Sequence, residues 1–433
     1  MGPEFTSTKA LMSQILRSRF PIILIDESQD TNKDLVNALL GVIKEHGDEL
    51  VIGMFCDTMQ RVYFDGLEDL SRAIPSNWEK PEKKMNHRSS KRIVTLANAI
   101  RATLDGQEQI PRSDASEGLV RFFIADSNSN KDHVEEEVLA RMLKLSDDSG
   151  WKQRDTVKIL ILEHHMAARR LGFLEFFTPL YSIGSFKNGV IDGTLPELSF
   201  VEPLVRLINA LQRGDGFEVS KVLRRYSPLL KRENKSEVEY DPLVRVKEVD
   251  EAVKKLQTMI EENEDISLNE VLLFIHDQGL LPLHERVESN LNDTNEELDG
   301  EKNLALREAF KVPLNQLQHY YTYVRDESPF STQQGVKGLE FERVMVIMDD
   351  QEARGFQFSY SKLFGTKEKT KADVDNEAEG KDTSISRTQR LFYVACTRAK
   401  ESLALVAYTD NILGARDTLL KYGWFDEGEI EVI

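Results

Sequence analysis

A short apolar run, FPIILI at residues 20–25, ends at two adjacent acids, Asp26 and Glu27. Apolar runs of this length are typical of strands in parallel sheets, which helices cover on both faces. Side chains at the carboxyl end of such a strand lie in the crevice where ligands bind. Two neighbouring carboxylates are costly there unless a positive group meets them. The run therefore predicts a buried strand that presents two acids to a positively charged group.

Similar apolar runs alternate with amphipathic segments through the N-terminal part of the chain. The run ELVIGMFCD at 49–57 also ends in an acid, Asp57. The segment 89–104 has apolar residues at helical spacing, and Ser89 is its expected N-cap. Such alternation favours a parallel α/β sheet. The expected strands are 20–25, 49–57, 118–126 and 156–164, and the expected helices are 32–48, 66–74, 89–104 and 133–145.

The pattern changes after about residue 195. From 196 to 327, helical periodicity and many charged residues predict an all-α insertion. The α/β pattern returns with an apolar run at 341–350, and residues 389–408 predict a helix followed by a strand. Between them, the segment 366–384 is polar, charged and free of large apolar residues, which predicts a mobile loop.

Composition limits the classes of protein that fit this chain. A net charge of −18 argues against a broad basic surface, although a local basic groove remains compatible with it. The apolar stretches are too short to span a bilayer, so we expect no membrane partner. Cys56 and Cys396 are far apart and match no metal spacing, and no secretory signal is visible, so we expect a cytoplasmic protein. The opening MGPEF, residues 1–5, is typical of a cloning scar.

Taken alone, the acids Asp26 and Glu27 fit two interpretations equally well. They suit a nucleotide-hydrolysing site, where one acid organises Mg²⁺ and the other orients or deprotonates the attacking water. They also suit a plain strand exit whose acids cap the next helix. Further polar, aromatic and basic residues beside predicted strands and helices favour the nucleotide site; they are Gln60, Tyr63, Arg88, Lys337, Glu340, Arg390 and Arg398.

Five segments in a fixed order carry a resemblance to a known family. They read LIDESQD, DTMQRVY, NHRSS, KGLEF and YVACTRA, starting at residues 24, 57, 86, 337 and 393. In this order they resemble motifs II to VI of the UvrD/Rep-type superfamily 1 DNA helicases. The resemblance implies RecA-like parallel sheets of the P-loop NTPase kind, ATP and Mg²⁺ as cofactors, single-stranded DNA as partner, and 3′→5′ translocation. The variant QGVKGLEF at 334–341 resembles a bacterial subgroup that is paired with an OLD-family nuclease, which implies a nuclease partner and a role in DNA repair or phage defence.

The resemblance also implies a role for each matching residue. Asp26 would hold Mg²⁺, and Glu27 would act as the catalytic base. Gln60 and Arg88 would contact the γ-phosphate, and Arg398 would be the arginine finger. Residues lining the nucleotide would be His87, Gly338, Glu340 and Arg390. Residues on the DNA path would be Tyr63, Phe64, Thr332 and Gln334.

One part of the family pattern is missing from this sequence. Phosphate-cradling loops need a glycine-rich stretch that ends in Gly-Lys-Ser or Gly-Lys-Thr. The only Gly-Lys pair here, Gly380-Lys381, is followed by Asp382. Without the loop, several charge-assisted phosphate contacts and a Mg²⁺ ligand are lost. We therefore expect no tightly bound cofactor and no ATP hydrolysis by this chain alone.

These observations give a domain hypothesis with alternatives. Residues 6–80 would be the remnant of a first RecA-like lobe, whose incomplete sheet would leave a strand edge exposed. Residues 81–195 and 328–433 would form the second lobe, and 196–327 the helical insertion. The chain would then be the C-terminal portion of a helicase. The alternatives are a non-catalytic module that binds DNA or a nuclease partner, and a phosphate loop supplied by a separate polypeptide.

Overall fold

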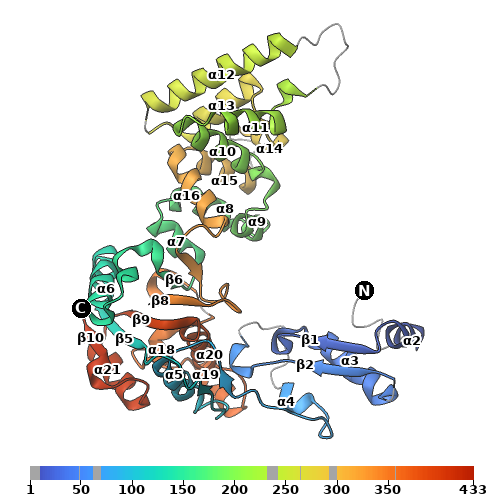
Figure 1. Ribbon diagram of the computed structural model, residues 1–433, viewed down its shortest axis with the longest axis vertical. Coiled ribbons are helices and arrows are strands. Elements are labelled where there is room, and N and C mark those ends of the chain that lie inside the picture. The colour runs from blue at the N-terminus through green and yellow to red at the C-terminus, as the bar shows by residue number, and fades with distance from the viewer. Residues whose placement is uncertain are drawn as a thin grey trace. The chain divides into compact units, whose positions relative to one another are not determined.

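The computed structural model describes residues 10–47, 49–61, 70–231, 242–263, 265–291, 300–355 and 357–433. The chain forms two compact units (Figure 1). We call Met1–Glu163 together with Ser331–Ile433 the sheet unit, and His164–Phe330 the helical unit.

The sheet unit contains a six-stranded sheet in the order β10-β5-β9-β8-β6-β7. Neighbouring strands pair in parallel in β10–β5, β5–β9, β9–β8 and β8–β6. This sheet confirms the predicted α/β class with its parallel strands. The strands are β5 (Leu119–Asp126), β6 (Lys158–Ile161), β7 (Phe330–Thr332), β8 (Phe341–Met348), β9 (Ala399–Thr409) and β10 (Ile430–Val432).

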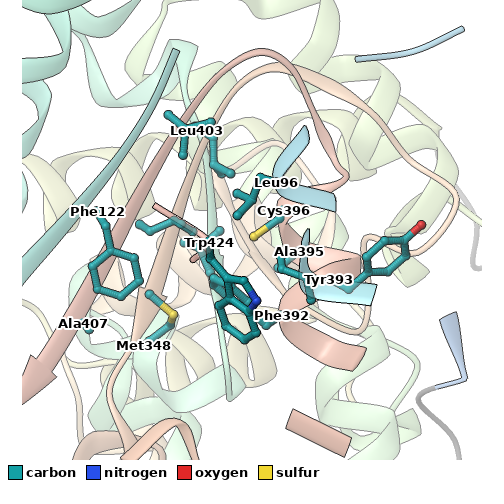
Figure 2. Packing of buried hydrophobic residues seen from close by; sticks show 14 of the residues in the cluster. Leu96, Phe122, Met348, Phe392, Tyr393, Ala395, Cys396, Leu403, Ala407 and Trp424 are labelled. Atoms are coloured by element: carbon teal, nitrogen blue, oxygen red, sulfur yellow. The ribbon is translucent and has the colours of Figure 1, made fainter. Parts of the chain in front are cut away.

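Helices α5 (Lys91–Arg101) and α20 (Ser384–Cys396) contribute apolar side chains to the core of this sheet. Figure 2 shows the packing, in which Leu96 of α5, Phe392 of α20 and Phe122 of β5 belong to one buried cluster. The rings of Phe392 and Trp424 stack with centroids 5.6 Å apart. Two further helices of the unit are α6 (Lys131–Ser146) and α21 (Ile412–Tyr422).

The predicted cap of α5 is off by one residue. The N-cap is Ser90, while the hydroxyl of Ser89 donates to the carbonyl oxygen of Ala399 at 2.8 Å. Ser89 therefore ties the start of the helix to β9 instead of capping it.

A second, two-stranded parallel sheet pairs β1 (Ile22–Ile25) with β2 (Val51–Met54). Helix α3 (Lys33–His46) covers one face through Leu39 and Val42. On the other face, Ile22, Leu24 and Val51 are 64%, 66% and 60% exposed. The prediction of a strand buried on both faces is therefore wrong for β1, because within the described residues only one layer of helix packs on this sheet. Further elements of the sheet unit are α2 (Ala10–Arg19), α4 (Leu70–Ala73) and the parallel pair of short strands β3 (Met85–Asn86) and β4 (Ile110–Pro111).

The helical unit confirms the predicted all-α character of residues 196–327 over their described part. The unit spans His164–Phe330, so it also includes residues 164–195, which are helical in most of their length. The domain boundaries expected from the sequence stay predictions. The helices of the unit are α7 (His164–Arg170), α8 (Leu174–Ser182), α9 (Lys187–Asp192), α10 (Val201–Gln212), α11 (Gly216–Tyr226), α12 (Pro242–Glu262), α13 (Leu268–Gln278), α14 (Glu285–Leu291), α15 (Glu301–Phe310) and α16 (Leu314–Val324).

The expected mobile loop at 366–384 is instead an ordered segment with its own helix, α19 (Lys371–Ala378). Asp373 is buried and accepts hydrogen bonds from Lys362 Nζ at 2.5 Å and from the hydroxyl of Ser384 at 2.7 Å. Partners outside the helix therefore supply the stabilisation that apolar residues do not. The short helices α17 (Asp350–Ala353) and α18 (Tyr360–Leu363) precede this segment.

Candidate functional site

The predicted acids lie at the carboxyl end of β1, in a turn with an unusual backbone. Glu27 has φ 50° and ψ 42°, a left-handed conformation that is uncommon for a residue with a side chain. Ser28 holds the turn, because its amide donates to the carbonyl oxygen of Phe55 at 2.9 Å and its hydroxyl to that of Ile25 at 2.8 Å. Asp26 is exposed and accepts from the amide of Glu27 at 3.0 Å. Backbone strain of this kind clusters at functional sites.

Buried Gln29 links the ends of the two strands. Its side-chain nitrogen donates to Glu27 Oε2 at 2.5 Å, and its oxygen accepts from the amide of Asp57 at 3.2 Å. Asp57 Oδ2 in turn accepts from Gln60 Nε2 at 3.0 Å. The structure therefore joins Glu27, Asp57 and Gln60 in one network at the carboxyl ends of β1 and β2.

Lys337, from the KGLEF segment, contacts the acids after β1. Its ammonium group lies 2.9 Å from Glu27 Oε2 and also pairs with Asp30. Partial burial raises the pKa of Glu27, but hydrogen bonds from Lys337 and Gln29 outweigh it, and the pKa is lowered overall. For Lys337, burial alone would lower the pKa. The carboxylates of Asp30 and Glu27 outweigh this effect, and the pKa of Lys337 is raised overall. Both groups are therefore held in their charged forms.

The predicted arginines are engaged by protein groups. Arg88 Nε donates to Glu340 Oε2 at 2.9 Å and Nη1 to the carbonyl oxygen of Thr397 at 3.3 Å. Arg398 is buried and donates to the carbonyl oxygens of Val394 and Leu339 at 3.0 and 3.2 Å. Burial and the neighbouring Arg88 lower the pKa of Arg398 to about 10. Arg398 thus makes the contacts of an arginine at a helix end, and its role as an arginine finger stays a prediction.

Two further charged residues of this region were not singled out from the sequence. Arg101 Nη2 lies 3.3 Å from Asp57 Oδ1 and 2.6 Å from Asp105 Oδ2. Asp382 accepts from both terminal nitrogens of Arg390, at 2.9 and 2.8 Å. Neither was visible in the sequence, because Arg101 lies in an apolar helix pattern and Asp382 in a polar run.

The chain is similar in sequence to known helicases and helicase-related proteins. Residues 218–410 match the family model described as UvrD-like helicase C-terminal domain. The Gabija protein GajB of Bacillus cereus (strain HuB5-5) is 23% identical over 441 residues, covering 93% of this chain and 60% of that protein. The ATP-dependent DNA helicase PcrA of Staphylococcus epidermidis (strain ATCC 35984) is 22% identical over 431 residues, covering 92% of this chain and 56% of that protein.

This chain is a relative of the UvrD/Rep-type superfamily 1 helicases. The matched range includes Lys337, Arg390 and Arg398 but lies downstream of Asp26 and Glu27. The chain spans 56–60% of the length of the two relatives. Its α/β fold with parallel strands agrees with the RecA-like fold expected of such a helicase relative.

The remaining predicted residues of this helicase relative lie near β3, β7 and the KGLEF turn. His87 is exposed after β3, and Gly338 has φ 83°, which favours glycine at this point of the KGLEF turn. Thr332 Oγ1 accepts from the amide of Gly335 at 3.1 Å, beside half-buried Gln334. The predicted DNA contacts at residues 63 and 64 lie outside the described residues.

Metal binding at this site rests on few groups. Within the described ranges, no cluster of three or more His, Cys, Asp or Glu side chains is arranged to hold a metal ion. Asp26 is an exposed carboxylate and fits a single water-mediated contact to Mg²⁺, as the helicase resemblance implies. The other ligands of such an ion would be phosphate oxygens, water molecules and the Ser or Thr hydroxyl of a phosphate loop, and no GxxxxGKS or GxxxxGKT loop occurs in the sequence.

Proposed function

We propose that this chain carries the magnesium side and the arginine side of the nucleotide pocket of a 3′→5′ DNA helicase or translocase. One observation supports this proposal above the others. Lys337 of KGLEF contacts Glu27 of DESQD, although more than three hundred residues of the sequence separate them. Two segments of the family pattern are thereby brought to one place. ATP, Mg²⁺ and single-stranded DNA are the ligands proposed for the intact protein.

Each candidate residue has a task in this proposal. ATP would supply the bond that is hydrolysed, and Mg²⁺ near Asp26 would neutralise phosphate charge. Glu27 would orient the attacking water and take its proton, while Gln60 would report the γ-phosphate through its amide. Arg88 and Arg398 would stabilise charge that develops on the phosphoryl group. Exchange of their present protein partners for phosphate oxygens is part of this proposal.

We further propose that this chain alone does not hydrolyse ATP. No GxxxxGKS or GxxxxGKT sequence occurs among its 433 residues, so the backbone amides and the lysine that cradle phosphates are not supplied. Phosphate release by the purified chain, with and without single-stranded DNA, tests this, with Glu27→Gln as the control. We expect background release from both proteins. DNA-stimulated release that Glu27→Gln abolishes would overturn the proposal.

A second candidate function is a non-catalytic module that docks on DNA or on a nuclease. The cations Arg88, Arg390 and Lys337 are each paired with a carboxylate of the same chain. This pairing favours a non-catalytic module, because the three cations are not available to bind the phosphates of a nucleotide. Within the described part of the chain, no helix is long and apolar enough to cross a membrane. The cysteines Cys56 and Cys396 are free thiols, which supports a cytoplasmic location for either function. Because both functions predict no hydrolysis by this chain alone, oligonucleotide binding that millimolar ATP with Mg²⁺ leaves unchanged would favour the module, and binding that ATP with Mg²⁺ alters would favour the nucleotide pocket.

A further inference from the structure

Two arginines of the sheet unit meet at one carboxylate. Arg61 and Arg390 are each only 8% exposed, and Arg390 Nε donates to the backbone carbonyl of Arg61 at 3.0 Å. Asp382 binds Arg390 through both carboxylate oxygens, at 2.9 and 2.8 Å, and the same carboxylate pairs with Arg61. Like charges this close repel each other, and a shared bidentate carboxylate offsets the repulsion.

Asp382 is held in place by the segment on which it lies. Upstream, buried Asp373 fastens α19 to Lys362 and to Ser384. Asn376 Nδ2 also donates to the carbonyl oxygen of Asp382 at 3.2 Å. These contacts hold the backbone on both sides of Asp382, which keeps its carboxylate within reach of the two arginines.

The contact joins two segments that the candidate site needs together. Arg61 directly follows the 3-10 turn Thr58–Gln60, and Arg390 lies on α20, whose C-terminal end leads to Arg398. Asp57 at the start of the turn accepts from Gln60, as described above. The ion pair between Asp382 and Arg61 therefore holds the C-terminal end of that turn.

We propose that Asp382 is a positioning residue that fastens the turn carrying Gln60 to helix α20. The role of Gln60 towards a nucleotide rests on the proposed function, whereas the fastening itself does not. A loss of fastening is measurable without nucleotide or DNA, so a failure of this inference is distinguishable from a failure of the proposed function.

Hydrogen exchange followed by mass spectrometry on the full chain tests the inference. The amides of Met59, Gln60 and Arg61 are hydrogen-bonded within the turn and report its opening. We expect Asp382→Asn to speed their exchange at least tenfold, and Asp382→Glu to restore most of the protection. The matched control is Asp375→Asn, an exposed acid on the same segment, which should leave exchange in the turn unchanged.

A double variant separates local fastening from general unfolding. If Asp382 acts through Arg61, then Arg61→Gln should speed exchange in the turn as Asp382→Asn does, and the two changes together should add little. Amides of β5 and β9 should keep their protection in all variants. Unchanged exchange in the turn of Asp382→Asn, effects of the two changes that multiply, or equal loss of protection in β9 would each overturn the inference.

Discussion

Replacing Lys337 by methionine should loosen the two-stranded sheet from the six-stranded sheet. The ammonium group pairs with Glu27 at 2.9 Å and with Asp30, so it ties the turn after β1 to the KGLEF segment. Methionine keeps most of the volume of the side chain and removes only the charge and its hydrogen bonds. The variant therefore isolates the ionic part of the contact.

The size of the effect follows from burial. The side chains of Lys337 and Asp30 are 11% and 12% exposed, and breaking such a pair from one side costs about 3–5 kcal/mol. The side chain of Glu27 is 45% exposed, so its share is screened and adds at most about 1 kcal/mol. Asp30 has a further interaction that remains. We therefore expect a loss of about 2–4 kcal/mol in the local opening free energy.

Hydrogen exchange at the amides of β1 and β2 is the suitable assay, because local opening need not follow global unfolding in a chain of two units. A loss of 2–4 kcal/mol corresponds to exchange about 30- to 1000-fold faster. The matched control is Lys400→Met, which removes a lysine that is three times as exposed as Lys337 and lies 2.7 Å from Glu342; it should change exchange less than about threefold. If Lys337→Met behaves like Lys400→Met, the assignment of a buried ionic link between Lys337 and Asp30 is wrong.

Two further predictions concern burial elsewhere in the chain. Burial lowers the pKa of His164, whose Nδ1 lies 2.8 Å from the hydroxyl of Tyr323, to about 4. Between about pH 6.5 and pH 4 the unfolded chain binds a proton at this histidine and the folded chain does not. The free energy of unfolding should therefore fall across this range, by up to about 3 kcal/mol. Urea titrations of wild type and His164→Gln measure this difference, and parallel pH profiles of the two proteins would contradict it. The exposed and covered faces of the two-stranded sheet should also differ. Leu24→Ser, on the exposed face, should change the free energy of unfolding by less than about 0.5 kcal/mol. Leu39→Ala, on the buried side of α3, should lower it by about 2–4 kcal/mol; equal losses in urea unfolding would show that both faces are packed.

The sequence predicted strands and helices well where apolar spacing alone decides them. The runs at 20–25, 118–126 and 341–350 contain β1, β5 and β8, and 133–145 lies within α6. Composition misled at 366–384, because the segment gains its order from ionic partners such as Lys362 rather than from apolar residues. Alternation of apolar residues also cannot tell whether a second layer covers a sheet, so the exposed face of β1 was not foreseen.

For the candidate site, the sequence pointed to single residues but not to the contacts between distant segments. Motif order led to Glu27, Gln60 and Arg88, whose types and positions are local properties of the sequence. Ion pairs between distant segments, such as Arg101 with Asp57 and Asp382 with Arg61, leave no local trace. They become visible only when the fold brings the segments together.

These pairs have a consequence for any anionic ligand of the site. Lys337, Arg88 and Arg390 each face a carboxylate of the same chain, so the local field is close to neutral although the cations are numerous. A triphosphate would have to displace carboxylates from these cations, and a displaced acid left buried and unpaired is costly. Glu340 and Glu27 are exposed enough to be released into water, whereas the acid on Arg390 is fixed by its own segment. Arg88 is therefore the cation that can change partners on nucleotide binding. Lys337 stays tied to Asp30, whose side chain is largely buried, and Arg390 stays where the fold holds it.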